Sequence, residues 1–256
     1  MAQIAVFQHH PLCSRQCALA VAEVLRRDHV VHIIGLTDIT PSGLQAYDLL
    51  VMPGGDGDAD RFQSLFALRR DHVRTFIEQG GAYLGICMGA YWGARNYFGL
   101  LPHTDSVQYI VRPRAEIRRS FKTTLRIEWE GASDSMFFYD GCTFISDIDH
   151  FDVIASYSNG DPMAIISNRI GLIGCHPESA EDWYDTPSLM PEWHHGRHHD
   201  LLRDFVSRLI GPAKNNIKSV IERLDHQSEI KDDLFQEAVQ EIRTLRSVLE
   251  LSLIHI

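Results

Sequence analysis

The stretch GGAYLGICMGAYWGA, residues 80–94, places a single cysteine between glycines at the end of an apolar run. The run AYLGI (82–86) predicts a buried strand, and the residues after Cys87 predict a helix. Cys87 would then lie at a tight turn from strand to helix, with its side chain projecting outward from the backbone. Such a turn tolerates only small close neighbours, which accounts for Gly85 and Gly89 two residues to either side.

This position gives the thiol a chemical advantage. It lies at the positive, N-terminal end of the predicted helix, and that end favours the thiolate form of a cysteine. The backbone N–H of Met88 would point toward the same space, so it is a candidate donor to an oxyanion. Cys87 is therefore a candidate nucleophile, although a buried structural cysteine is the common alternative.

A nucleophilic cysteine needs a base and a group that orients the base, and GLIGCHPES (171–179) offers both. Pro177 favours an extended backbone at His176. In an extended chain, residues two apart point to the same side, so Glu178 can accept a hydrogen bond from the His176 imidazole and fix its tautomer. The sequence thus predicts a Cys87–His176–Glu178 triad.

Strands and helices alternate through the first half of the chain. Strands are predicted at QIAVF (3–7), VVHII (30–34) and YDLLVMPGG (47–55), and helices after Ser14 and over 65–79, 88–97 and 201–210. This alternation indicates a mostly parallel sheet with helices on both faces. From about residue 106 to 175, short β-rich segments predict extra strands, some of them antiparallel.

Other loops should reach the same carboxyl edge of the sheet, where such folds bind ligands. Gly54 and Gly55 let backbone amides approach a reacting carbonyl, which makes Gly55 a candidate second oxyanion donor. Asp56 is a candidate substrate contact, and Asp56, Asp58 and Asp60 resemble a calcium loop only weakly, because its later ligands are missing. His10 could also contribute to the pocket, with an exposed loop as the alternative.

Composition excludes several classes of function. The chain has 256 residues, 45% of them hydrophobic, and a formal net charge of −10 without a basic stripe, which argues against nucleic acid as a partner. Its apolar runs are too short for a membrane span, and no secretory signal is evident. Five cysteines suit a reducing cytoplasm. Cys13 and Cys17 are four residues apart near a predicted helix start, and this spacing favours packing residues over a metal site. No cofactor is expected. The histidine-rich PEWHHGRHHD (191–200) closely follows the predicted triad loop, so we expect it to line the mouth of the active site rather than to bind a metal.

The C-terminal segment differs from the rest. We predict a main domain over 1–211 and an amphipathic helical extension over 212–250, which would pack on the body or, as the alternative, form a homodimer through 213–250. The last six residues, LSLIHI, are encoded by CTGTCTCTTATACACATC, which matches a transposase adapter end. We therefore interpret 251–256 as an artefact and leave the natural C-terminus open.

The motifs together resemble a known superfamily. VMPGGD, GGAYLGICMGAYWGA and GCHPE are similar to motifs of the class I glutamine amidotransferase-like superfamily. FFYDGCTF (137–144) and AIISNRIGLIGCHPE narrow the resemblance to the amidotransferase-like N-terminal domain of eukaryotic-type biotin–protein ligases, which also occurs alone in bacteria. Over residues 3–210 the resemblance implies a flavodoxin-like three-layer α/β sandwich. It also implies Cys87, His176 and Glu178 as the triad, with Gly55 and Met88 as oxyanion donors.

One departure affects the expected substrate. Class I glutaminases usually carry glutamine two residues after the last glycine of the elbow, where this chain has Tyr91, a residue that borders the pocket or packs in the core. We therefore expect a cysteine hydrolase that cleaves a small-molecule or peptide amide through a thioester. A non-catalytic binding module and a glutaminase subunit feeding a separate synthase are the alternatives. A redox or aldehyde-handling role would need a carboxylate near the thiol, for which Glu23 is the only candidate.

Overall fold

The structure is a computed structural model that describes residues 1–9, 14–55 and 59–211, without the side chains of 59 and 60. His10, Asp56, the helical extension over 212–250 and the terminal 251–256 lie outside the described residues. The first 211 residues, Met1–Gly211, form one compact unit. Within the described ranges, no helix combines the length and the apolar composition needed to cross a bilayer.

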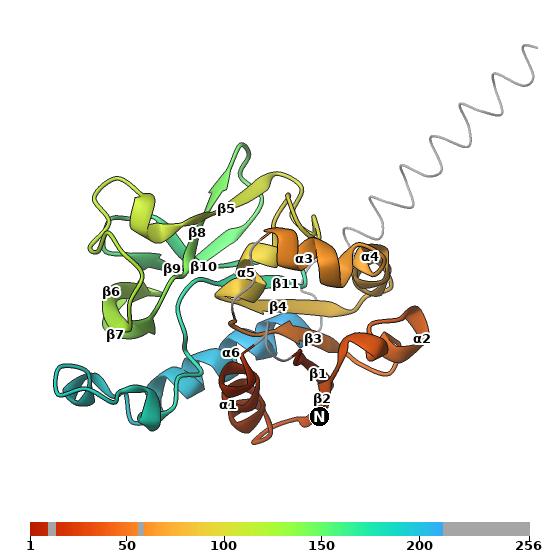
Figure 1. The fold of residues 1–256 in the computed structure, drawn as a ribbon, viewed down its shortest axis with the longest axis horizontal. Helices are drawn as coiled ribbons and strands as arrows, with labels where there is room; N and C mark the ends of the chain where they lie inside the picture. The colour runs from red at the N-terminus through yellow and green to blue at the C-terminus, as the bar shows by residue number, and fades with distance from the viewer. Residues whose placement is uncertain (10–13, 56–58, 212–256) are drawn as a thin grey trace, which may run out of the picture. The chain divides into compact units, whose positions relative to one another are not determined.

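A central sheet organises the described residues, in which it has nine strands in the order β2-β1-β3-β4-β11-β10-β9-β6-β7 (Figure 1). The parallel half consists of β2 (Val30–Ile34), β1 (Gln3–Phe7), β3 (Leu49–Met52), β4 (Ala82–Ile86) and β11 (Ile170–Ile173). The antiparallel half consists of β10 (Pro162–Ser167), β9 (Asp152–Tyr157), β6 (Thr123–Trp129) and β7 (Ala132–Phe138). A separate antiparallel pair is formed by β5 (Thr104–Gln108) and β8 (Cys142–Ser146).

Helices cover both faces of the parallel half (Figure 1). One face carries α1 (Arg15–Leu25) and α6 (Arg197–Ile210), and the other carries α2 (Pro41–Leu44), α3 (Ala59–Phe66), α4 (Arg70–Glu78) and α5 (Met88–Gly93). Alternate residues of β1 enter the two hydrophobic cores: Ile4 and Val6 pack with α1, and Ala5 and Phe7 pack on the opposite face. Burial on both sides explains why β1, β3, β4 and β11 are almost continuously apolar in sequence, whereas the edge strand β2 is mostly exposed.

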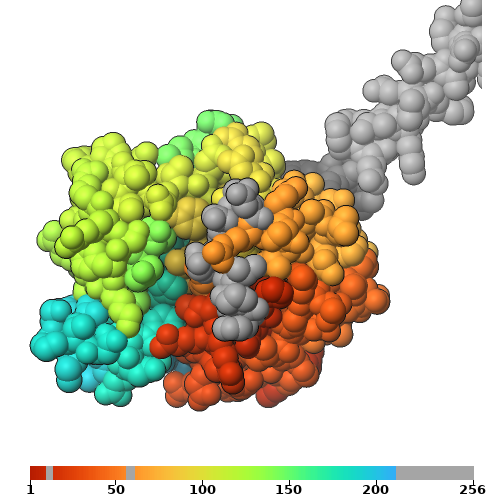
Figure 2. All heavy atoms as spheres, viewed as in Figure 1, coloured from red at the N-terminus to blue at the C-terminus, as the bar shows by residue number. Residues whose placement is uncertain are grey.

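The predicted flavodoxin-like α/β sandwich with extra strands in its second half is confirmed. Figure 2 shows the first half of the chain, red to orange, beside the β-rich second half, yellow-green to cyan. The sheet joins these halves because β11, from late in the sequence, pairs in parallel with β4. The carboxyl ends of β4 and β11 therefore lie next to each other, and the two predicted motifs follow directly from them.

Three local predictions are wrong in detail. The helix predicted over 65–79 is two helices, α3 and α4, and Leu68 at the break is 85% exposed, so it is not part of the apolar face. The helix predicted over 88–97 ends at Gly93, because Ala94 is extended and bridges to Leu101. β8 was not anticipated, since its sequence CTFIS is short and directly follows a turn.

Candidate active site

Cys87 occupies a strained turn between β4 and α5. Its backbone has φ 51° and ψ −108°, a conformation that residues other than glycine rarely adopt. The Cys87 N–H donates to the Ile173 carbonyl over 2.8 Å. A Cβ placed on Gly85 would lie 2.3 Å from the Gly89 carbonyl oxygen. A Cβ on Gly89 would lie 1.8 Å from the Met52 carbonyl oxygen. Close packing of α5 against β4 and β3 therefore requires both glycines, as the sequence predicted.

The strain at Cys87 leads to a test by substitution. We expect Cys87→Gly to be more stable than Cys87→Ala by about 1–2 kcal/mol, because both lack the thiol but only alanine keeps a Cβ at positive φ. Urea unfolding of the two variants measures this difference. If alanine proved equally stable or more stable, the turn would not be strained as described.

His176 is held by contacts on several sides. Its backbone N–H donates to the Phe137 carbonyl over 2.9 Å, and its ring packs against the rings of Phe137 and Trp183, with centroid distances of 6.1 and 5.6 Å. Its Nδ1 lies 2.8 Å from Oε1 of Glu178, and both residues are buried. The side chains of His176 and Glu178 therefore meet, as the extended His-Pro-Glu turn predicted.

The electrostatics of His176 link the pair to Cys87. Burial, the largest influence, would lower the pKa of His176, but the electrostatic interactions of its ring with Glu178 and with Cys87 raise the pKa well above its ordinary value. Because Nδ1 faces Glu178, the other ring nitrogen, Nε2, is left for the thiol. The ring is thus favoured as an imidazolium between a carboxylate and a sulfur atom.

The other predicted site residues that the structure describes are Met88, Gly54, Gly55 and Tyr91. Within the described residues, the Met88 N–H at the start of α5 donates to no acceptor, so it suits an oxyanion donor. A Cβ on Gly54 would lie 2.7 Å from Cε1 of His176, so Gly54 packs directly on the imidazole. Gly55 is exposed next to it. The Tyr91 hydroxyl donates to the Asp140 and Gly141 carbonyls over 3.4 and 3.3 Å, and burial raises its pKa.

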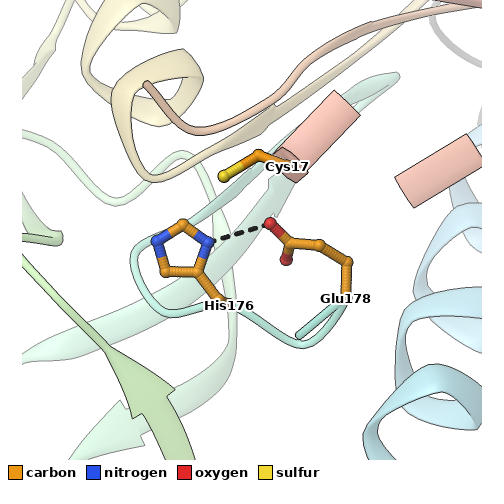
Figure 3. Close-up of side chains that lie close together, drawn as sticks. All are labelled: Cys17, His176 and Glu178. Carbon is orange, nitrogen blue, oxygen red and sulfur yellow. Dashed lines mark hydrogen bonds and ion pairs between the residues drawn. The ribbon is translucent and has the colours of Figure 1, made fainter. Parts of the chain in front are cut away.

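Cys17 was predicted to be a packing residue, yet it lies at the site. It is on the first turn of α1, whose cap is Ser14 as predicted, and the Ser14 hydroxyl accepts from the Cys17 N–H over 3.2 Å. Its sulfur, a His176 nitrogen and a Glu178 oxygen all lie within 4.8 Å of one another (Figure 3). Burial raises the pKa of Cys17 to about 11. No local pattern marks Cys17, because only tertiary folding brings α1 to the turn after β11.

The histidine-rich segment packs behind Glu178. Ser179 follows Glu178 in the chain, and its carbonyl accepts from Nε2 of both His194 and His199 over 3.0 Å. His198 pairs with Asp134 over 3.1 Å. Burial and the neighbouring His198 and His199 lower the pKa of His194 to about 3, which keeps its ring neutral. Since His194 and His198 are buried, they do not line the mouth of a pocket, and they support the turn that carries Glu178.

The redox or aldehyde alternative needs a carboxylate beside the Cys87 thiol, and Glu23 was the suggested residue. Glu23 lies on α1 and is exposed. It is therefore not the buried carboxylate that such a role would need beside the thiol.

Comparison with solved structures identifies the fold. A crystal structure of a glutamine amidotransferase matches with a TM-score of 0.57 and 19% identity, over 82% of this chain and 99% of that one. A glutamine amidotransferase from Thermotoga maritima matches with a TM-score of 0.60 and 11% identity, over 82% and 98%. The chain has the class I glutamine amidotransferase-like fold. Residues 10–99 of this amidotransferase-like chain also match the family described as "Biotin-protein ligase, N terminal".

A sequence relative exists in Chlamydia muridarum. It is described as an uncharacterized protein and is 30% identical over 152 residues. The match covers 49% of the amidotransferase-like chain and 57% of the relative, so the chain spans little more than half of that protein's length.

Proposed function

We propose that the chain is a cysteine-dependent amidase of the class I amidotransferase-like type, acting on a small-molecule or peptide amide. The observation that carries the proposal is that one buried imidazole, His176, lies 2.8 Å from the Glu178 carboxylate and interacts electrostatically with Cys87. A nucleophile, a base and an orienting group in contact form the arrangement that covalent catalysis requires. The backbone strain at Cys87 supports the proposal, because such strain is concentrated at functional sites.

The reaction follows from these positions. Cys87 Sγ attacks the amide carbonyl carbon as a thiolate beside the His176 imidazolium, and the carbonyl oxygen becomes an oxyanion near the Met88 and Gly55 amides. His176 then gives its Nε2 proton to the departing amine as the C–N bond breaks and a thioester forms. Water, deprotonated by His176, attacks the thioester and releases the acid and the thiol. Glu178 keeps its hydrogen bond to Nδ1 throughout and stabilises the imidazolium.

Substrate contacts are proposed at the same edge. Gly54 approaches the imidazole closely, and the loops that carry His10 and Asp56 follow β1 and β3 at the carboxyl end of the sheet. Tyr91 replaces the expected glutamine, and its hydroxyl is directed to the carbonyls of Asp140 and Gly141. We therefore favour an amide other than glutamine, and ammonia release from glutamine would support the glutaminase alternative.

The pH profile of Cys87 alkylation by iodoacetamide tests the proposal. In a buffer with chelator, we expect the wild-type rate to stay high through neutral pH, because His176 stabilises the thiolate. In His176→Ala the rate at pH 7 should fall about tenfold, and its midpoint should move to higher pH. Mass spectrometry of the Cys87 peptide gives the rates, and His32→Ala, which removes an exposed imidazole on β2, is the matched control.

A second candidate is a binding module that keeps the pocket without turnover. The burial of Cys87, which is only 7% exposed, favours this alternative. A slow Cys87 that is indifferent to His176→Ala would exclude the amidase and leave the binding module. A reactive, His176-dependent thiol would exclude an inert pocket and justify screening amides.

A further inference from the structure

Cys17 is a buried thiol that the proposed reaction does not use. Its sulfur reaches over the His176–Glu178 pair from the start of α1 (Figure 3). The exposed fractions are 8% for Cys17, 4% for His176 and 0% for Glu178. Residues more than 150 positions apart in the chain therefore bring a thiol, an imidazole and a carboxylate within 4.8 Å of one another in a nearly closed space.

These three groups are the ligand types that zinc prefers in proteins. Zinc binds thiolate sulfur at about 2.3 Å and imidazole nitrogen or carboxylate oxygen at about 2.0–2.2 Å, in tetrahedral geometry. Two ligand atoms on one zinc ion are then roughly 3.3–3.7 Å apart. From the present spacing, with no pair beyond 4.8 Å, shifts of about 1 Å would bring the three atoms onto one ion.

A second observation independently points to a missing partner. The Oε2 atom of Glu178 is buried and has no hydrogen-bond partner among the described residues. A buried carboxylate oxygen without a partner is costly, and a bound cation would satisfy it. Gly54 keeps the ring and the thiol close together, because a Cβ there would lie 2.7 Å from Cε1 of His176 and 3.0 Å from Sγ of Cys17.

We propose that Cys17 Sγ, His176 Nδ1 and the Glu178 carboxylate bind a thiophilic divalent cation such as Zn²⁺, with water at the fourth position. Binding releases the protons of Sγ and Nδ1 to solvent and leaves the ring with one proton, at Nε2. Such a ring can donate to Cys87 but cannot accept its proton, so the bound cation blocks the base. This block rests on the proposed function, whereas binding of the cation does not.

Proton competition sets the conditions for binding. Burial raises the pKa of Cys17 to about 11, so its thiol is protonated at neutral pH and the cation must displace that proton. Affinity should therefore rise with pH, as it does wherever a metal replaces ligand protons. Zn²⁺ and Co²⁺, which bind thiolate well, are the suitable probes, and Mg²⁺ is a negative control.

Cobalt titration of the metal-free full chain tests the site. We expect one Co²⁺ per chain, a near-ultraviolet thiolate-to-cobalt charge-transfer band, and displacement of Co²⁺ by Zn²⁺. Cys17→Ser should abolish the band and weaken binding at least about tenfold, and Glu178→Gln should weaken it similarly. Cys87→Ser and the matched control Cys142→Ala, which removes another buried thiol, should leave the band unchanged.

The outcomes separate the alternatives. No band in wild type, a band that persists in Cys17→Ser, or a band lost in Cys87→Ser would each overturn the site. X-ray absorption at the zinc edge gives a second measurement that does not depend on how Cys17→Ser folds. One sulfur ligand in both wild type and Cys87→Ser supports the site, and a sulfur ligand lost in Cys87→Ser overturns it.

Alkylation of Cys87 gives a further test of where zinc binds. The metal-bound ring still donates its Nε2 proton to Cys87, so stoichiometric Zn²⁺ at the proposed site should change the rate of Cys87 alkylation in wild type by less than about threefold. Strong slowing by Zn²⁺ in both wild type and Cys17→Ser would overturn the site, because zinc would then act at Cys87 itself. If Cys87 were already slow without metal, the amidase proposal would fail while cobalt binding at Cys17 could still be measured.

Discussion

Gly89→Ala is expected to destabilise the chain by more than about 3 kcal/mol, enough to unfold a domain of ordinary stability. The new Cβ would lie 1.8 Å from the Met52 carbonyl oxygen, so α5 and β3 would have to separate. The new Cβ and the Met52 carbonyl oxygen are both fixed to the backbone, so a change of side-chain rotamer cannot relieve the clash. Urea unfolding followed by circular dichroism measures the loss.

The matched control for this prediction is Gly35→Ala. Gly35 has φ −104°, and a Cβ there would meet only Asp38 Oδ2, at an ordinary 3.7 Å. We expect this substitution to change the free energy of unfolding by less than about 1 kcal/mol. Equal effects at the two glycines would show that the close approach of α5 to β3 is not what Gly89 provides.

The same close approach connects stability to the proposed chemistry. Because Gly85 and Gly89 let α5 lie against β4 and β3, the helix begins directly after Cys87. The Met88 N–H then emerges beside the thiol without an acceptor among the described residues. A larger residue at either glycine would move the proposed nucleophile and oxyanion donor together.

Local sequence predicted the parts of the site that depend on local geometry. The elbow at Cys87 follows from glycine spacing, and the His176–Glu178 contact follows from two residues in an extended chain. Their association across β4 and β11 follows from the rule that parallel strands end at one edge. The fold could be predicted for the same reason, since alternating apolar strands and helices specify its layers.

The missed features depend on tertiary packing. Cys17 reaches the pair because it lies in the first turn of α1, which follows the carboxyl end of β1, whereas helical spacing alone favoured a packing role. His194 and His199 support Ser179 through its backbone carbonyl, which carries no side-chain signature in the sequence. Leu68 lies within the helix predicted over 65–79, but α3 ends two residues earlier, at Phe66, and α4 begins at Arg70.

Glu178→Gln is expected to change how stability depends on pH. In wild type, Glu178 helps to raise the pKa of His176 well above its ordinary value near 6.5. The native state then holds a proton that the unfolded chain loses above about pH 6.5, so this contribution to stability is complete below that pH. It decreases as pH rises toward the folded pKa, by up to about 1.4 kcal/mol per pH unit.

In Glu178→Gln the carboxylate is gone, and burial, which lowers the pKa of His176, becomes the dominant influence. The variant should therefore lack the decrease above pH 6.5. At pH 6 we expect wild type to be more stable by about 3 kcal/mol, and this difference should shrink as pH rises. Urea unfolding of both proteins with chelator, from pH 6 to 9, gives the difference between their free energies of unfolding at each pH. Groups that titrate in the same way in both proteins do not contribute to this difference.

The exposed Glu23→Gln variant on α1 provides the control, and its difference from wild type should be flat with pH. Parallel curves for wild type and Glu178→Gln would mean that the folded chain holds no more protons than the unfolded chain. That result is expected if His176 is neutral, and also if the proton on His176 has come from Cys87. A converging pair of curves instead shows that the folded chain holds an extra proton on His176 before any substrate binds.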